Sequence, residues 1–456
     1  MGRDDRPVRR PASSRALVAA CIGNLVEWYD FAIYSAFATV LASTYFPGAD
    51  DTAGLLATFA VFAIAFAARP VGAVLFGRRG DRLGRRQVLA TVIILMSLAT
   101  AGIGLLPSYA TIGVLAPVLL VLLRLAQGLS LGGEAANASA FAIEYAPEGR
   151  RGWYGAWLWG TVGLGSGGGI GVAAVLAWLL PQSTLEAWGW RLAFLVALPL
   201  GVIGLYLRLR LEETPAFEAV QRAGVVARRP VTETLRGYPG RVLAGFGLVA
   251  AAALTFNTFF VYLPSHLVSA LDVSLSRALG AALGGLSLIV AVSPPLGRLS
   301  DRVGRKPLLA AGMIGLLTLT VPSYLLVRAG GPVSLPLGYL LVGSALSCLV
   351  LPSFLAELFP TPVRSTALAI TYGLATALVG GTAPFLDTLL VRRTGNPLIP
   401  AYYATAVTLA AAIGLLVTRE TAFQPLDADE DRRARPRRQD QAANEAADRI
   451  WSSGRS

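Results

Sequence analysis

The chain has 456 residues, of which 54% are hydrophobic and only 14% are charged. Soluble domains carry about 25% charged residues, so this composition cannot cover a water-facing surface and predicts an integral membrane protein. The net charge of +12 does not indicate nucleic-acid binding, because the basic residues fall in alternate loops and in the tails instead of on one compact face. Cys21 and Cys348 lie inside apolar segments without a spaced framework, which implies neither a disulfide nor a metal site.

Apolar segments long enough to cross a bilayer recur along the sequence, since one span needs roughly 20 apolar residues. We predict an all-α membrane protein with twelve transmembrane helices in two pseudo-symmetric six-helix bundles. The spans are expected to start near Ala16, Ala53, Gln87, Thr111, Trp153, Trp190, Arg241, Leu275, Pro307, Val333, Pro362 and Ile399. The expected parts are an N-terminal tail (1–15), a first bundle (16–207), a central loop (208–240), a second bundle (241–419) and a charged, disordered tail (420–456).

Arginine is concentrated in alternate connections between these spans. If the N-terminus is cytoplasmic, the outer loops hold only Arg277, Arg328, Arg392 and Arg393, and all other loop arginines are inside. The positive-inside rule therefore predicts that both termini are cytoplasmic, because an even number of spans returns the chain to the side on which it began.

The first span carries two acidic residues, Glu27 and Asp30. With a rise of 1.5 Å per residue, they lie roughly 16 and 20 Å into the membrane, and their i, i+3 spacing places them on one helix face together with Tyr34. A charge at bilayer depth costs at least ~2.5–3.5 kcal/mol, so it usually has a partner or a function. The first span is therefore a candidate functional helix.

A loop between the second and third spans recurs in the second half of the chain. Residues 77–86 and 297–306 share six of ten positions, and Glu144, Pro147 and Arg151 recur as Glu357, Pro360 and Arg364. The two repeated motifs are separated by nearly the same number of residues. This indicates that one half of the chain duplicates the other, as in many membrane transporters. We predict that the repeated residues latch one conformation through breakable charge contacts; the alternative is that they only signal topology. The candidate latch residues are Asp81, Arg82, Gly84, Arg85, Glu144, Arg151, Asp301, Arg302, Gly304, Arg305, Glu357 and Arg364.

The fourth span carries Arg124, which falls roughly 20 Å into the membrane by the same rise. Gln127 shares its face, and Glu134 lies deeper toward the cytoplasm. We expect Glu27, Asp30 and Arg124 to form one intramembrane network that binds and releases a proton; a permanent ion pair that only fixes helix packing is the alternative. The second half offers no matching charge at mid-depth.

These residues resemble the major facilitator superfamily, whose repeated Gly-x-x-x-Asp-Arg-x-Gly-Arg loops are its most recognisable motif. Within it, residues 23–31, 124–128, 132–134 and 357–364 resemble signatures of the metabolite:proton symporters. Residues 46–50, 198–208, 211–217 and 400–403 are most similar to bacterial proline/betaine transporters. The resemblance covers roughly residues 16–426 and implies a central cavity lined by spans 1, 4, 7 and 10, with proton-coupled uptake across a bacterial inner membrane by alternating access. Osmotic activation is not implied, because the tail contains Pro436 and no heptad repeat.

We therefore predict a proton symporter that imports a small zwitterionic or anionic solute, with proline or betaine favoured. The alternatives are a symporter for a dicarboxylate, ketoglutarate, citrate or shikimate-type acid, a proton-driven exporter, and a sensor without flux. No enzyme is expected, because the sequence has no Gly-x-Ser-x-Gly elbow and no zinc motif. No cofactor, metal or nucleic acid is expected, and we predict a monomer whose partners are substrate, proton and lipid bilayer.

Two sets of side chains are predicted to carry out transport. The proton-coupling candidates are Glu27, Asp30, Arg124 and Glu134. The substrate-binding candidates are Asn24, Trp28, Tyr29, Tyr34, Arg124, Gln127, Asn257 and Tyr262. Trp28 and Tyr29 are included because an aromatic face attracts a quaternary ammonium group, although helix packing explains them equally well.

Overall fold

A computed structural model describes residues 12–47, 50–83, 85–132, 134–144, 146–209, 230–360 and 363–424. Within these residues the chain forms helices and no strand. The N-terminal half contains α1 (Ala12–Ala36) with α2 (Ala38–Tyr45), α3 (Asp51–Leu83), α4 (Arg85–Leu105), α5 (Tyr109–Ile112) with α6 (Leu115–Leu131) and α7 (Glu134–Glu144), α8 (Arg151–Leu179), and α9 (Gln182–Thr184) with η1 (Leu185–Gly189), α10 (Arg191–Leu195) and α11 (Ala197–Leu209). The C-terminal half contains α13 (Pro230–Gly237), α14 (Pro239–Asn257) with η2 (Thr258–Tyr262) and α15 (Leu263–Leu271), α16 (Leu275–Val303), α17 (Arg305–Arg328), α18 (Ser334–Ser347) with α19 (Leu351–Leu358), α20 (Arg364–Ala375) with η4 (Thr376–Gly380) and α21 (Ala383–Thr394), and α22 (Ile399–Val417).

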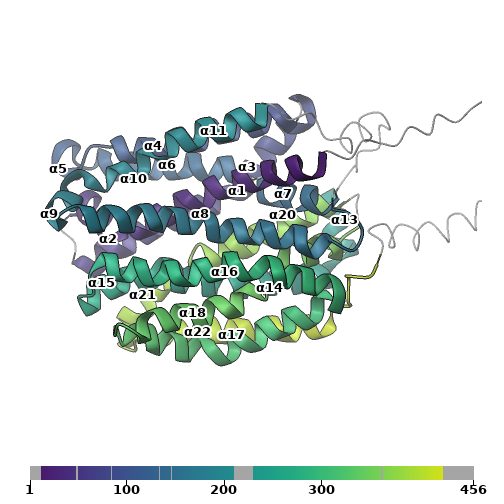
Figure 1. Cartoon of the computed structure of the whole chain (residues 1–456). Helices are drawn as coiled ribbons and strands as arrows, with labels where there is room; N and C mark the ends of the chain where they lie inside the picture. Colours follow the sequence, from purple (N-terminus) through teal and green to yellow (C-terminus); the bar gives the residue numbers. More distant parts are fainter. Residues whose placement is uncertain are drawn as a thin grey trace, which may run out of the picture.

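Apart from the short helix α13, these elements follow the twelve predicted spans. In the described part of the chain, eight helices are long and apolar enough to cross a membrane, and a bent pair in the sixth segment, Gln182–Gly189 with Arg191–Tyr206, would make a ninth. The shorter apolar helices Ala90–Leu105 and Leu115–Leu131 belong to the third and fourth segments. Figure 1 shows the long helices running side by side, with the first and last described helices both reaching the right-hand end of the view.

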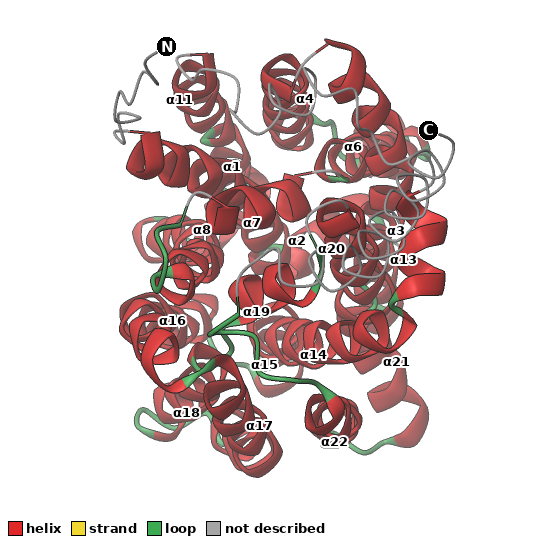
Figure 2. Ribbon diagram, turned by 90° about the vertical axis from the view of Figure 1, so that its right-hand side faces the viewer, coloured by secondary structure: helices red, strands yellow, loops and turns green. Residues whose placement is uncertain are grey.

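The two halves repeat one packing pattern. In the N-terminal half α1 packs on α8, α3 on α6, and α4 on α11; in the C-terminal half the equivalent pairs are α14 with α20, α16 with α18, and α17 with α22. Seen end-on in Figure 2, the first set occupies the upper part of the molecule and most of the second set the lower part, with α20 beside α3 at the level where the halves meet. The predicted duplication into two pseudo-symmetric bundles is confirmed.

The halves meet mainly where α8 packs on α16 and α19, where α7 packs on α20, and where α3 packs on the α20–α21 segment. Small residues allow α8 and α16 to approach closely: a Cβ on Gly297 would lie 2.4 Å from the Cβ of Ala156, and one on Gly152 would lie 2.4 Å from the carbonyl oxygen of Gly297. Inside a bilayer the hydrophobic effect does not drive helices together. Membrane helices therefore associate by close packing at small residues.

Helices α3 and α6 are held together by a pair of glycines. A Cβ on Gly128 would lie 2.0 Å from the carbonyl oxygen of Ala65, and one on Gly72 would lie 2.0 Å from that of Leu129. Gly128 follows Gln127 and lies one helical turn after Arg124. The contact of Gly128 with α3 therefore determines how closely the part of α6 that carries Arg124 approaches α3.

We expect Gly128→Ala to lower the melting temperature, because the backbone of α3 must shift and overpacking costs about 1–3 kcal/mol. Gly160→Ala in α8 is the matched control, since a Cβ there would meet no atom within 4 Å. Thermal unfolding of the detergent-purified variants compares them. Equal melting temperatures for the two variants would contradict this account of the α3–α6 contact.

Candidate functional site

Asp30 of α1 lies at the centre of a buried polar cluster in the N-terminal half. Its Oδ2 accepts a hydrogen bond from Arg124 Nη1 at 2.9 Å, and its Oδ1 accepts one from Gln127 Nε2 at 2.6 Å. Thr100 of α4 also donates to Oδ1, at 2.7 Å. All four residues are at most 1% exposed. The structure thus brings together Asp30, Arg124 and Gln127, and adds Thr100, which was not among the predicted site residues.

Arg124 also lies against three aromatic rings. Its guanidinium carbon lies 3.9 Å from the centre of the Tyr34 ring and 5.4 Å from the rings of Phe31 and Phe62. Its Nε and Nη2 have no hydrogen-bond partner within the described residues. Ring faces offset part of the cost of such unbonded N–H groups. The charge of Arg124 therefore depends mainly on a single carboxylate, that of Asp30.

Glu27 does not join this cluster, which corrects the prediction of a single network. Its Oε1 accepts a hydrogen bond from Nη2 of Arg69 in α3 at 2.7 Å, and both residues are buried. The sequence analysis overlooked Arg69, although it is an arginine in the middle of a predicted span. Equal depth in the membrane did not ensure contact, because the side chains of one helix point to different neighbouring helices. Among the described residues, the N-terminal half therefore holds two buried ion pairs, Asp30–Arg124 and Glu27–Arg69.

A small cavity of about 40 Å³ lies between the two halves; Asn24, one helical turn before Glu27, lines it, whereas the four residues of the two ion pairs do not. It is lined by Asn24 of α1, Ser139 of α7 and Trp159 of α8 on one side, and by Leu351 of α19 and Tyr372 of α20 on the other. Such a volume has room for a few water molecules. Most of its lining is apolar, and Asn24, Ser139 and Tyr372 bring polar groups to its border.

The other aromatic candidates of the first span differ in their surroundings. The Trp28 ring packs edge-on against Phe256 of the C-terminal half at 5.3 Å, and its Nε1 donates to Oδ1 of Asn24 at 3.2 Å. The Tyr29 hydroxyl instead donates to the carbonyl oxygen of Ala193 at 2.7 Å, inside the N-terminal half. Trp28 therefore borders the space between the halves, whereas Tyr29 joins two helices of one half.

In the seventh segment the α-helix gives way to the π-helix η2, a distortion that is frequent at functional sites. Asn257 donates to the carbonyl oxygen of Ala253 on its own helix at 2.8 Å, and the Tyr262 ring stacks on that of His266 at 5.3 Å. Neither residue reaches the polar groups of the N-terminal half by a hydrogen bond that the described residues show. Both are buried.

The C-terminal half does contain a buried charged group, contrary to the expectation that it had no counterpart to Asp30. Asp387 of α21 is 0% exposed and accepts a hydrogen bond from Thr258 at 2.7 Å through Oδ2, while its Oδ1 has no partner within the described residues. The sequence signal was an acidic residue inside an apolar span, which was read as part of the span alone.

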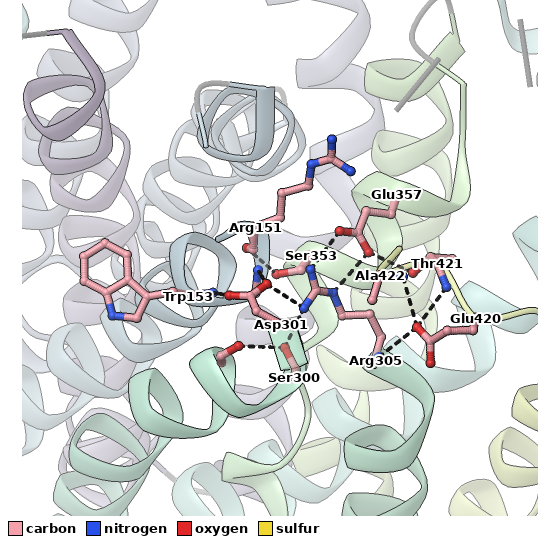
Figure 3. Close-up of polar contacts among 12 residues, drawn as sticks. Arg151, Trp153, Ser300, Asp301, Arg305, Ser353, Glu357, Glu420, Thr421 and Ala422 are labelled. Atoms are coloured by element: carbon pink, nitrogen blue, oxygen red, sulfur yellow. Dashed lines mark hydrogen bonds and ion pairs between the residues drawn. The ribbon is translucent and has the colours of Figure 1, made fainter. Parts of the chain in front are cut away.

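At one end of the molecule, Asp301 connects the halves. Its two carboxylate oxygens accept hydrogen bonds from the backbone N–H groups of Gly152 and Trp153, at 2.7 and 3.0 Å. These N–H groups belong to the first turn of α8, where they lack helical partners and where the helix dipole favours an anion. A carboxylate of the C-terminal half thus caps a helix of the N-terminal half, as Figure 3 shows.

Arg305 organises the same end of the molecule. It is 1% exposed and forms two hydrogen bonds with Glu357, at 2.9 and 3.1 Å, and one with Asp301 at 2.9 Å. Glu420, just after α22, accepts from the backbone N–H groups of Arg305 and Lys306 at the start of α17. Burial alone would raise the pKa of Glu420, but the backbone N–H groups around it hold that pKa below its usual value.

Other predicted latch residues lie around this centre. Arg364 donates to Glu144 at 2.9 Å, which is an ion pair between the halves, and the carbonyl oxygen of Arg151 accepts a hydrogen bond from Ser353 at 2.9 Å. Gly304 has φ = +104°, and a Cβ there would lie 2.5 Å from the carboxylate of Glu420, so the turn requires glycine. Arg302 is exposed. We call Asp301, Arg305, Glu357, Arg364 and Glu144 the latch.

Some predicted residues cannot be placed. Gly84 lies outside the described residues, and the side chains of Asp81, Arg82, Arg85 and Glu134 also lie outside what the structure describes. Among the residues that the structure describes, no group of three or more His, Cys, Asp or Glu side chains could hold a metal ion.

The opposite end of the molecule has weaker contacts between the halves. Arg392 and Asp50 form an ion pair at 2.6 Å, but their side chains are 45% and 56% exposed. An exposed pair of this kind contributes about 0–1 kcal/mol. The Ser265 hydroxyl adds one hydrogen bond of 3.4 Å to the carbonyl oxygen of Ser35. The buried charge contacts between the halves are therefore concentrated at the latch end.

Comparison with known proteins gives consistent matches. The family model described as sugar (and other) transporters matches residues 16–241 and 230–431. The proline/betaine transporter of Escherichia coli (strain K12) is 38% identical over 424 residues, covering 90% of this chain and 84% of that protein. The glycine betaine/proline/ectoine/pipecolic acid transporter OusA of Dickeya dadantii is 39% identical with the same coverage. The ectoine/proline transporter ProP of Corynebacterium glutamicum is 35% identical over 440 residues, covering 93% of this chain and 87% of that protein.

Solved structures agree on the fold. The major facilitator superfamily proton:xylose symporter XylE, bound to 6-bromo-6-deoxy-D-glucose, superposes with a TM-score of 0.72 at 18% identity, covering 93% of this chain and 99% of that one. The partially occluded inward-open form of XylE from E. coli gives a TM-score of 0.71 at 20% identity, covering 90% and 99% of the two chains.

Proposed function

Because the chain belongs to the sugar (and other) transporter family, we propose that it is a proton-coupled symporter that imports a small zwitterionic solute, with proline or betaine as the first candidates. The substrate class is that of relatives that are 35–39% identical, which are transporters of proline, betaine and ectoine. We further propose a bacterial inner-membrane location with both termini and the latch in the cytoplasm, supported by the distribution of arginines.

The observation that carries the proposal of proton coupling is the environment of Asp30. This carboxylate is 1% exposed and shares one charge-assisted hydrogen bond with Arg124. A proton that binds Asp30 removes the negative charge that holds Arg124, and release of the proton restores the ion pair. Because a buried ion pair and its neutral form favour different local arrangements, proton binding at Asp30 would change the energy of α1 relative to α6.

Alternating access also requires that the ends of the two bundles separate in turn. The latch joins the ends that we propose to be cytoplasmic, through Asp301 on α8 and Arg364 on Glu144, and the opposite ends are joined mainly by the exposed pair Arg392–Asp50. Inward opening would break the contacts of Asp301 with α8 and of Arg364 with Glu144. The proposed cycle is therefore one in which proton and substrate enter from outside and the latch then opens toward the cytoplasm.

Uptake by purified protein in liposomes tests this function. We expect labelled proline or glycine betaine to accumulate when an inward proton gradient is imposed, and accumulation to collapse when a protonophore is added. Ketoglutarate, citrate and xylose serve as comparison substrates. Accumulation of proline that ignores the gradient would exclude proton coupling, and preferred uptake of an organic acid would replace the proposed substrate class.

A further inference from the structure

The Glu27–Arg69 pair differs from the Asp30 cluster in how its charges are satisfied. Arg69 Nη2 bonds to Glu27 Oε1 at 2.7 Å, while Arg69 Nε is buried and has no hydrogen-bond partner within the described residues. The guanidinium carbon lies 4.3 Å from the centre of the Phe66 ring and 5.1 Å from that of Phe31. Arg69 therefore keeps an unused donor and a pair of aromatic faces beside its charge.

This pair lies where the two halves meet. The Tyr372 phenol of α20 is within electrostatic range of both Glu27 and Arg69, and the same Tyr372 lines the cavity between the halves. Asn24, one helical turn before Glu27, lines that cavity from the other side. Phe66, which stacks on Arg69, packs closely against Gly381 of the C-terminal half. Glu27 and Arg69 thus lie beside the space that changes when the halves move.

Asp30 has a different position. Its hydrogen-bond donors are Arg124, Gln127 and Thr100, all on helices of the N-terminal half. Arg124 is enclosed by Tyr34, Phe31 and Phe62, which belong to the same half. Of the two ion pairs, the one formed by Glu27 and Arg69 is the better placed to meet a solute.

We propose that Glu27 and Arg69 are the charge-recognition site for the solute: Arg69 binds the carboxylate, Glu27 binds the ammonium group, and the two residues pair with each other when the site holds no solute. This rests on the proposed function as a transporter of zwitterions. The planar guanidinium matches a carboxylate by two parallel N–H bonds, and the adjacent rings attract an N-methylated ammonium that cannot donate hydrogen bonds.

The arrangement also defines the class of solute that fits. A solute that separates the two side chains must supply one charge of each sign, or it leaves a buried charge without a partner. Molecules with a carboxylate and an ammonium one or two carbon atoms apart meet this requirement. A solute that carries only a carboxylate leaves Glu27 unpaired, and a solute that carries only an amine leaves Arg69 unpaired. Both bind weakly, because one buried charge then has no partner.

Binding to the detergent-purified protein, measured by calorimetry, tests the site without requiring transport. The ligands are proline, cyclopentanecarboxylate, which lacks the amine, and pyrrolidine, which lacks the carboxylate. For the unaltered protein we expect proline to bind roughly 30-fold or more tighter than either analogue. Glu27→Gln is expected to lose most of this preference over cyclopentanecarboxylate. Arg69→Gln is expected to lose the preference over pyrrolidine.

Glu186→Gln, at an exposed glutamate in η1, is the matched control and should keep the preferences of the unaltered protein. If Glu27→Gln does not purify as a single folded species, Glu27→Asp keeps the charge but retracts it, and should weaken proline binding while leaving cyclopentanecarboxylate binding unchanged. Unaltered discrimination in the Glu27 and Arg69 variants would overturn the proposal. Intact discrimination combined with uptake that ignores a proton gradient would leave this site standing and remove the proton coupling.

Discussion

Asp30→Asn is expected to abolish proton-driven accumulation of the substrate while leaving substrate exchange across the membrane in place. The amide oxygen of Asn can still accept the hydrogen bond from Arg124, while its NH2 group replaces Oδ1 and requires Gln127 and Thr100 to turn their oxygens toward it as acceptors. The amide cannot take up a proton in the physiological range, so the gradient can no longer drive the cycle. In liposomes we expect the ratio of internal to external proline to fall to about 1, the value at which no gradient is used.

Two assays separate this outcome from simple loss of folding. Counterflow, in which unlabelled substrate inside drives entry of labelled substrate, should remain within several-fold of the unaltered protein, roughly the size of a 1 kcal/mol change. Asp272→Asn is the matched control, because Asp272 is an exposed aspartate at the end of α15, outside both ion pairs and the latch. Full accumulation by Asp30→Asn under the proton gradient would show that Asp30 does not carry the proton.

Arg305→Gln is expected to open the latch end of the protein. Arg305 is buried and bonded to Glu357 and Asp301, so its replacement leaves two carboxylates without their main cationic partner. These partners belong to the same half as Arg305, so the effect on the contact between the halves is indirect: the substitution loosens Asp301, whose carboxylate caps α8 of the other half. The equilibrium should therefore shift toward the conformation in which the latch is open, by roughly tenfold, which corresponds to about 1.4 kcal/mol.

Labelling of a cysteine at Ala156 measures this shift, since Ala156 is 1% exposed and faces α16 near the latch. In a background in which Cys21 and Cys348 are serine, Arg305→Gln should raise the rate of reaction with a bulky maleimide by at least about tenfold. Arg302→Gln is the control, because Arg302 is the exposed neighbour of Asp301. Equal labelling rates in the two variants would show that Arg305 does not hold the halves together.

Much of the architecture follows from hydropathy and from the repeat. The duplicated loop predicted two halves, and the structure shows equivalent helix pairs in each half. The depth argument for Asp30 and Arg124 succeeded because both residues also point into the N-terminal bundle, where α1 and α6 can meet. Asp301, Arg305, Glu357 and Arg364 recur in sequence and do come together at one end of the molecule.

The partner of Glu27 could not be predicted by the same reasoning. Depth along a helix gives a height in the membrane, but contact also depends on the direction in which a side chain points and on which helices are neighbours. Glu27 and Asp30 are one turn apart, yet one faces α3 and the other faces α6. Arg69 and Asp387 were each an isolated charge in an apolar span, and only the packing of the segments shows that one is paired and the other bonded to Thr258.

Glu420 shows a further limit of sequence reasoning. It lies at the boundary between the last span and the charged tail, where no local pattern distinguishes it from the acidic residues that follow. In the structure it accepts hydrogen bonds from the first N–H groups of α17, which no helical carbonyl can satisfy. This role depends on the end of α22 lying beside the start of α17, a tertiary contact that the sequence of either segment does not contain.

The central claim is that the two buried ion pairs have different functions. Asp30–Arg124 binds the proton, and Glu27–Arg69 binds the solute. Counterflow and gradient-driven accumulation of proline, measured side by side in Asp30→Asn and Glu27→Gln liposomes, test it most directly. We predict that Asp30→Asn retains counterflow and loses accumulation, whereas Glu27→Gln loses both. The same pattern of loss in the two variants would contradict the division.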